Sequence, residues 1–558
     1  MTSLPLVETP YGVIEGLNHE TPEGFEAEIF LGIPFAKPPI NELRFEKPQL
    51  PTKWKTSLKA DKFGKPAITF PVRKFKDGDE DCLTLNLFKP KKTDEECNLF
   101  PTMVYIHGGG FVSGSSREWG YKEVCRKLVS HGLIVVTLNY RLGPFGFFTT
   151  GDGNIPGNYG IWDMIQALKF LQEILPSFNG DASNVTIFGH SAGGMATSLL
   201  TLTPETKNLF ARAIPMSGSA LSKSSNNPFL VKHSKMVAEA LGIDFSSLRL
   251  RDEIIEVSAD QIKEAVKSFI PEMLRVDEVV LVHFSPRIDG DLFKEKPATN
   301  LVCKSDVSKP ILMGLVDQEA ILFAVNPFGK LATSGKYIWI HPDDIPNVDK
   351  TRFSDYVTQK LADKKIFGSS AKDYADAVIN FYETNVKVSN NNNRYLTMLT
   401  QLISDVNFNI PALREAKSRA AAGQKVYFYL YTYINPKYKS QYFDAVAHAD
   451  ELPCFFDAPV GKPNVEMKGE EGEVQKSFAE LFVNFARNGN AQTQGLQLPL
   501  VTPENIPYIK IDKELLIEND LWPERINFWN KLAEDFGFDW PSGVSTKHPE
   551  KNVLMDLE

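Results

Sequence analysis

The most constraining feature of this chain is a serine set between glycines directly after a short apolar segment. Residues 185–187 are Val, Thr and Ile, and residues 188–194 read Phe-Gly-His-Ser-Ala-Gly-Gly. Helix-forming residues follow from Met195 to Leu200. This order predicts a strand, a sharp turn and a helix, with Ser191 raised on the turn. The glycines are needed because a side chain on either flank would crowd such a turn. Ser191 is therefore a candidate nucleophile, and the alternative is a glycine-rich turn with an inert serine.

A second glycine-rich segment follows another predicted strand. Residues 102–106 favour a strand and lead into His107 and three successive glycines. Acyl transfer places negative charge on a carbonyl oxygen, and backbone N–H groups aimed at that oxygen stabilise it. Such donors come from the residue after the nucleophile and from a glycine-rich loop. We therefore expect the N–H groups of Gly109, Gly110 and Ala192 to form an oxyanion hole. The alternative for the three glycines is a flexible turn.

A serine nucleophile of this kind is followed in the chain by an acid and then by a histidine. Of the nine histidines, three come after a plausible acid: His341, His448 and His548. His341 and His548 each precede a proline, which favours loops. His448 follows the strand-like segment 426–431 and is the favoured general base.

Two carboxylates are candidates for the acid. The predicted strand 310–315 is followed closely by Asp317 and Glu319. Catalytic groups in open α/β sheets gather at the carboxyl ends of strands. Spacing does not separate the two residues, and either could be an ordinary solvated carboxylate.

These segments and several further motifs resemble the type-B carboxylesterase/cholinesterase family, from about Val7 to Trp529. The resemblance implies an α/β-hydrolase fold, with a large, mostly parallel central sheet flanked by helices and with helical insertions that form a lid or gorge. The further motifs are residues 31–39, 43–45, 80–86, 139–143, 157–160, 210–214, 217–219 and 484–489.

The resemblance also implies residue roles. It selects Glu319 rather than Asp317 as the acid, and it makes Ser191 the nucleophile and His448 the base. It assigns the oxyanion donors to Gly109, Gly110 and Ala192. It implies two structural ion pairs, Arg44–Glu80 and Arg141–Asp163. It also implies a substrate pocket lined by Val282, Phe284, Leu322 and Phe323. For these four residues, a role as ordinary core residues is about as good an explanation as a role in the pocket.

Two departures from the family pattern bear on the substrate. His190 stands before the nucleophile, where the family usually has Glu, and residues 69–74 contain no tryptophan. A quaternary ammonium group is recognised by an aromatic face over the cation. The departures argue against a cholinesterase and favour a general carboxylesterase, similar to intracellular invertebrate esterases. His190 either touches the site or has a purely structural role.

Composition limits the partners and the compartment. The net charge of −9 discourages binding to nucleic acid or anionic membranes. No apolar run approaches the ~20 residues of a membrane span. No motif indicates a cofactor or a metal. No secretory signal precedes the family sequence, and five scattered cysteines fit a reducing compartment. We expect a cytoplasmic protein.

The whole pattern predicts one α/β-hydrolase domain over residues 1–540, with a helix-rich flanking or lid region at about 325–423 and a polar tail over 541–558. The expected function is hydrolysis of small-molecule carboxylic esters through an acyl-enzyme on Ser191, which organophosphate-type inhibitors should also modify. The alternatives are a dedicated lipid or hormone esterase, an acyltransferase with the same triad, and a non-catalytic binding or adhesion protein. The sequence does not determine the oligomeric state.

Overall fold

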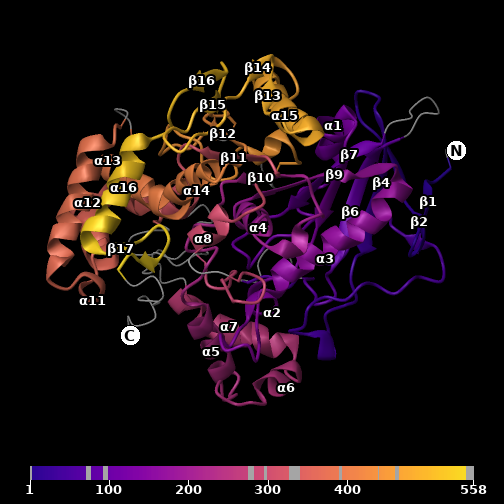
Figure 1. The fold of residues 1–558 in the computed structure, drawn as a ribbon, viewed down its shortest axis with the longest axis horizontal. Helices are drawn as coiled ribbons and strands as arrows, with labels where there is room; N and C mark the ends of the chain where they lie inside the picture. The colour runs from indigo at the N-terminus through magenta and orange to yellow at the C-terminus, as the bar shows by residue number, and fades with distance from the viewer. Residues whose placement is uncertain are drawn as a thin grey trace.

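An 11-stranded mixed sheet forms the centre of the molecule (Figure 1). The computed structural model describes residues 3–70, 77–91, 99–273, 282–294, 298–325, 340–388, 392–437, 439–458, 464 and 466–547. In order across the sheet, the strands are β16 (Leu516–Glu518), β15 (Tyr508–Ile511), β12 (Val426–Tyr431), β11 (Ile311–Val316), β10 (Arg212–Met216), β9 (Gly180–His190), β7 (Phe100–Ile106), β8 (Ile134–Leu138), β6 (Thr84–Pro90), β4 (Glu26–Pro34) and β3 (Leu17–Glu20).

The central part of this sheet is parallel. Each neighbouring pair from β15 through β12, β11, β10, β9 and β7 to β8 runs in the same direction. The edges are antiparallel, with β16 on one side and β6, β4 and β3 on the other. Parallel neighbours require crossover connections, and helices supply them. The prediction of a large, mostly parallel sheet is therefore confirmed.

Helices cover both faces of the sheet, and alternate residues of a strand reach different cores. On β7, Val104 and Ile106 join one core, whereas Met103 and Tyr105 join the other. The first core includes residues of α3 (Tyr159–Ile174), α4 (Ala192–Leu200) and α14 (Ile410–Ala421), and the second includes residues of α1 (Lys122–Lys127) and α15 (Gly469–Asn488). All residues of β8 are buried. Burial on both faces of the sheet explains why this strand does not alternate between buried apolar and exposed polar residues.

The region predicted to be helix-rich contains several helices in its described residues: α10 (Lys350–Tyr356), α11 (Lys364–Phe367), α12 (Ala371–Asn385), α13 (Arg394–Ser404) and α14. A π-helical segment, η9 (Asp405–Asn409), joins α13 to α14. Helix α12 packs on α16 (Pro523–Phe536), where the rings of Phe381 and Phe528 stack with centroids 3.9 Å apart. In Figure 1, α11, α12, α13 and α16 stand at the end of the molecule opposite the amino terminus.

Smaller elements complete the fold. Strands β1 (Leu6–Thr9), β2 (Gly12–Glu15) and β5 (Leu58–Lys59) form a separate sheet. Two hairpins are β13 (Gln492–Thr493) with β14 (Leu496–Gln497), and β17 (Phe538–Asp539) with β18 (Val544–Ser545). The remaining α-helices of the described residues are α2 (Gly143–Phe147), α5 (Leu230–Ala240), α6 (Leu250–Ile255), α7 (Ala259–Met273), α8 (Ala298–Cys303) and α9 (Ile321–Ala324).

The packed chain extends beyond the boundary expected at residue 540. The hairpin of β17 and β18 crosses it, and the buried Trp540 indole N–H donates to the carbonyl of Leu361 at 2.7 Å. Ser545 is also buried. The packed domain therefore includes residues up to Ser545, and the rest of the expected tail, residues 548–558, lies outside the described part.

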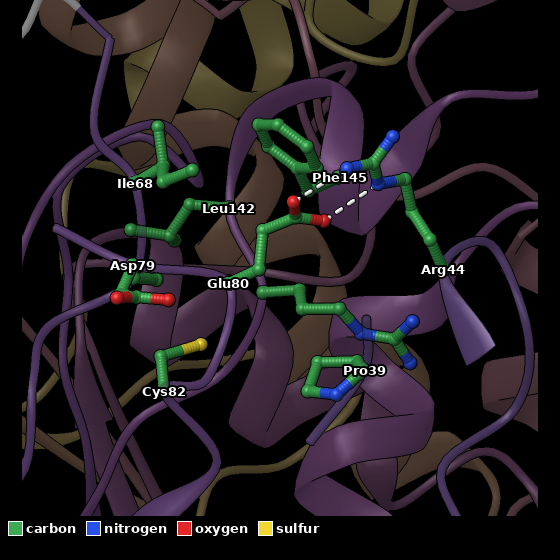
Figure 2. Close-up of a pocket in the computed structure, with 10 residues that line it drawn as sticks. Pro39, Arg44, Ile68, Asp79, Glu80, Cys82, Leu142 and Phe145 are labelled. Atoms are coloured by element: carbon green, nitrogen blue, oxygen red, sulfur yellow. Dashed lines mark hydrogen bonds and ion pairs between the residues drawn. The ribbon is translucent and has the colours of Figure 1, made fainter. Parts of the chain in front are cut away.

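Both predicted structural ion pairs are present. Arg44 donates two hydrogen bonds of 2.6 Å to the carboxylate of Glu80, which Figure 2 marks with dashed lines. Arg141 donates two bonds of 2.8 and 2.7 Å to Asp163. These bidentate pairs join segments that are distant in the chain, and we assign them to the scaffold. Within the described ranges, no helix combines the length and apolar character that crossing a membrane requires.

Candidate active site

Ser191 occupies a strained turn between β9 and α4. Its φ of 60° and ψ of −124° lie in a region that non-glycine residues rarely adopt. The Ser191 N–H donates to the carbonyl of Met216 at 2.9 Å, and the Ser191 carbonyl accepts from the N–H of Met195 at 2.8 Å. The surrounding strand and helix thus hold the serine in a conformation that it would not adopt alone.

The flanking glycines are required by close backbone contacts. A Cβ atom on Gly189 would lie 2.4 Å from the carbonyl oxygen of Gly193. A Cβ atom on Gly193 would lie 2.0 Å from the carbonyl oxygen of Ile106. Both distances are well inside van der Waals contact, so the steric reason given for the motif is confirmed.

Glu319 and His448 are joined by a hydrogen bond, with 2.5 Å between Oε2 and Nδ1. The other carboxylate oxygen, Oε1, accepts the N–H of Val316 at 3.0 Å. Both side chains are buried. Asp317 is used differently, since its Oδ1 accepts the N–H of Val446 at 2.8 Å. The geometry therefore pairs the histidine with Glu319, as the family resemblance implied.

Asp317 has an unusual electrostatic environment. Burial, with a smaller contribution from the charge of Glu319, raises the pKa of Asp317 to about 7. Its bond to Val446 holds the chain just before His448. Asp317 is therefore an anchor of the histidine loop rather than its acid partner.

The ring of His448 lies beside the segment that carries Ser191. Its centroid is 4.4 Å from that of His190, the residue before the serine. The buried Nε2 of His448 has no hydrogen-bond partner in the described part of the chain, and it makes no bond to the Ser191 hydroxyl. Catalytic hydrogen bonds of this kind are often loose in the absence of substrate.

The predicted oxyanion loop lies next to Ser191. A Cβ atom on Gly108 would be 3.1 Å from the Ser191 Cβ, which shows how closely the two segments approach. Gly109 and Gly110 have φ values of 113° and 62°, which glycine adopts readily. Their N–H groups donate to no protein acceptor among the residues that the structure places. These donors are free for a substrate oxygen.

Two of the four predicted pocket residues lie next to the predicted catalytic groups. A Cβ atom on Gly110 would lie 3.7 Å from a Val282 methyl group, and the Phe323 ring centroid is 5.8 Å from that of His448. Phe284 is fully buried, and its ring lies 6.2 Å from that of His233. Leu322 is half-buried on α9, one residue before Phe323.

Phe408 is a site residue that the sequence did not indicate. Its ring centroid lies 4.9 Å from that of His448 and 5.8 Å from that of Phe323. It belongs to η9, which enters the site from the helix-rich region. A π-helical turn is common near functional sites, but no local sequence signal distinguishes this phenylalanine from a core residue.

Comparison with known proteins places the chain in a family. The carboxylesterase family model matches residues 3–529. Gut esterase 1 of Caenorhabditis briggsae is 32% identical over 564 residues, covering 99% of this chain and 97% of that protein. Carboxylesterase 1E of Mus musculus is 30% identical, covering 95% of this chain and 94% of the relative.

Solved structures agree with the sequence relatives. The Geobacillus stearothermophilus carboxylesterase EST55 superposes with a TM-score of 0.75 at 25% identity, covering 94% of this chain and 99% of that one. A PNB esterase superposes with a TM-score of 0.73 at 26% identity, covering 94% of this chain and 100% of that one. With this fold and these relatives, the chain belongs to the carboxylesterase family and is a carboxylic ester hydrolase.

Proposed function

We propose that this esterase works through an acyl-enzyme on Ser191, with His448 as general base and Glu319 as its acid partner. The hydrogen bond between His448 and Glu319 carries this proposal. It joins residues 129 positions apart in the chain, beside the strained turn that bears the serine. An isolated buried histidine would not need a buried carboxylate, whereas a general base that becomes a cation does.

Acylation follows from these positions. As the Ser191 hydroxyl oxygen attacks the ester carbon, His448 Nε2 takes the hydroxyl proton. The N–H groups of Gly109, Gly110 and Ala192 hold the resulting oxyanion, and loss of one such donor would cost about 3 kcal/mol. His448 then gives its proton to the leaving alcohol as the ester C–O bond breaks.

Deacylation repeats these steps with water. His448 takes a proton from the water molecule that attacks the acyl carbon, and it returns that proton to the Ser191 oxygen as the acid leaves. An alcohol in place of water would give an acyl transfer product. Turnover with competing alcohols, followed by product analysis, separates hydrolysis from transfer.

The apolar groups at the site support uncharged esters as substrates. Phe408 and Phe323 lie against His448, and Val282 lies against the glycine loop. We infer that medium-length acyl esters and aromatic esters are favoured, because apolar walls gain free energy when they cover apolar substrate surface.

A covalent-labelling experiment tests the nucleophile. Ser191→Ala is compared with Ser217→Ala, a buried serine whose hydroxyl has no hydrogen-bond partner in the described chain. An organophosphonate should add one adduct to the wild type and to Ser217→Ala, and none to Ser191→Ala. Ester turnover of Ser191→Ala should fall by about 10⁴-fold or more. An equal adduct on Ser191→Ala would reject the assignment.

We also infer a cytoplasmic location, on the basis of the scattered cysteines. Of these, Cys82, Cys125, Cys303 and Cys454 carry free thiols. Fractionation of the source cells with an antibody to the full chain tests the location, and recovery in the secreted fraction would contradict it.

A further inference from the structure

A buried polar cluster lies behind the predicted catalytic histidine. The ring of His190 packs on that of His448, with centroids 4.4 Å apart, and its Nε2 lies 3.5 Å from Oε1 of Glu451. The His190 and Glu451 side chains are 4% and 1% exposed. Among the described residues, neither His190 Nε2 nor either oxygen of Glu451 has a hydrogen-bond partner. Buried polar groups are nearly always paired, so this cluster requires an explanation.

The surroundings of Glu451 offer no permanent cation among the described residues. The groups that face it, besides His190, are acids, phenols and one thiol: Glu319, Asp450, Tyr105 on β7, Tyr429 and Tyr431 on β12, and Cys454. Burial and the charge of Glu319 raise the pKa of Glu451 well above its ordinary value. Burial and the charge of His448 lower the pKa of His190 well below its ordinary value. Both directions favour a neutral carboxylic acid beside a neutral imidazole.

Two tyrosines extend the same cluster. The hydroxyl groups of Tyr105 and Tyr429 are buried and have no partner in the described chain. Tyr429 lies across Gly314, where a Cβ atom would fall 2.1 Å from its ring. The glycine therefore makes room for this ring at the level of the site. Among the described residues that interact with Glu451 there is no lysine or arginine, so the cluster is suited to sharing a proton rather than to holding a charge.

We propose that Glu451 is a positioning residue that is protonated at neutral pH and donates a hydrogen bond to Nε2 of His190, which then holds a fixed, neutral ring against His448. The two atoms need to approach by about half an ångström to form this bond. The proposal rests on the proposed function, because it concerns the environment of the general base.

A neutral pair has a consequence for catalysis. It places no carboxylate anion behind the ring of His448, whose hydrogen-bonded partner is Glu319. A second buried carboxylate would stabilise the imidazolium further, so that His448 would remain protonated to higher pH and would serve less well as a base. The pair instead orients the ring without adding charge.

Two substitutions test this role. Glu451→Gln keeps the shape and a hydrogen-bond donor, whereas Glu451→Leu removes the donor. We expect the acid limb of kcat/KM against pH to coincide for Glu451→Gln and the wild type. We expect Glu451→Leu to lower kcat about tenfold with little change in KM. The Glu451→Gln variant should keep the kcat of the wild type, because it keeps the hydrogen-bond donor. A Gln variant whose limb moves to lower pH would overturn the proposal, since it would show that an anion had been removed. A Leu variant with wild-type kcat would also overturn it.

An infrared measurement tests the protonation state without using activity. The spectrum of the protein at pH 7 is compared with that of Glu451→Gln, both in an Asp317→Asn background because the pKa of Asp317 is about 7. We expect the difference spectrum to contain the carbonyl stretch of a protonated carboxylic acid. Its replacement by carboxylate bands would overturn the proposal.

The two proposals fail in distinguishable ways. Organophosphonate titration counts folded active sites in each variant, and thermal unfolding shows whether the variants fold. A wild type that is not labelled at Ser191 would refute the proposed nucleophile but would leave the infrared result intact. A wild type that is labelled, combined with a carboxylate signal from Glu451, would refute only the role of Glu451.

Discussion

The two carboxylate oxygens of Glu319 have different hydrogen-bond partners. Oε1 accepts the N–H of Val316, and Oε2 faces Nδ1 of His448. In the proposed mechanism, the carboxylate orients the imidazole and keeps its proton on Nδ1, so that Nε2 is left to act as the base. Asp317, two residues earlier, carries the same chemical group but serves the backbone of the histidine loop.

This arrangement predicts the effect of Glu319→Gln. The glutamine oxygen would keep the bond from the Val316 N–H, so the amide nitrogen would face Nδ1 and force the wrong histidine tautomer. We expect kcat to fall by about 10³–10⁴-fold. Ester turnover measures the loss, and Asp317→Asn is the matched amide control that keeps most of the activity. A Glu319→Gln enzyme within tenfold of the wild type would exclude Glu319 as the acid.

The raised pKa of Asp317 predicts that the stability of the protein depends on pH. Its pKa is raised from 3.8 to about 7 by burial. Between these values the folded chain keeps a proton that the unfolded chain releases, so the free energy of unfolding falls as pH rises. Asp317→Asn removes this loss and keeps an acceptor for Val446. The melting temperature of the variant relative to wild type should be higher at pH 8 than at pH 5. An equal difference at both values would contradict this assignment.

At the scale of elements, α14 is tied to α4, the helix that follows the proposed nucleophile. Glu415 of α14 accepts hydrogen bonds from the hydroxyls of Ser198 on α4 and Ser219 after β10, and from the N–H of Ala220. Arg419, one turn later, pairs with the same carboxylate at 2.7 Å, and both side chains are fully buried. This network fastens the helix-rich region to the elements that hold the Ser191 turn.

Removal of the Glu415 carboxylate should destabilise the folded protein. Glu415→Ala leaves the buried guanidinium of Arg419 without its anion, so we expect a loss of about 3–5 kcal/mol in the free energy of unfolding. Urea unfolding measures it. Lys417→Ala on the same helix is the control, because its exposed hydrogen bond to the carbonyl of Glu504 should contribute about 1 kcal/mol or less. Equal losses for the two variants would refute the special role of Glu415.

At the scale of the whole molecule, the two cores leave the thiols in different environments. Cys82, Cys125 and Cys454 are buried, whereas Cys303 is exposed. Burial raises the pKa of the Cys454 thiol to about 11 and raises those of Cys82 and Cys125 as well. A buried thiol with a raised pKa is unreactive toward alkylating reagents.

Alkylation of the native protein should therefore modify Cys303 first. The experiment uses a Cys97→Ser variant, because Cys97 lies outside the described residues, and peptide mass mapping before and after denaturation. Modification of Cys82, Cys125 or Cys454 at the rate of Cys303 in the native state would show that the cores open far more readily than this packing allows.

The order of strands and helices around the nucleophile could be predicted from local pattern. The strand expected at 102–106 lies within β7, and the helix expected from Met195 to Leu200 lies within α4. Extended apolar runs and helical spacing are local properties, so the printed sequence contains them. Phe408 and Glu451 were not predicted, because their importance arises from contacts with His448 and His190 that local spacing does not contain.

The sequence by itself determined the strained turn, since only glycine fits at the two positions where backbone carbonyls would meet a Cβ atom. The choice between Asp317 and Glu319 was open on the residues alone, although the family resemblance favoured Glu319. The tertiary structure pairs His448 with Glu319 through register: Gln318 and Ala447 form a parallel bridge, which aligns the next residues, Glu319 and His448. A pairing between distant segments is a property of the folded chain, because sheet register sets which side chains meet.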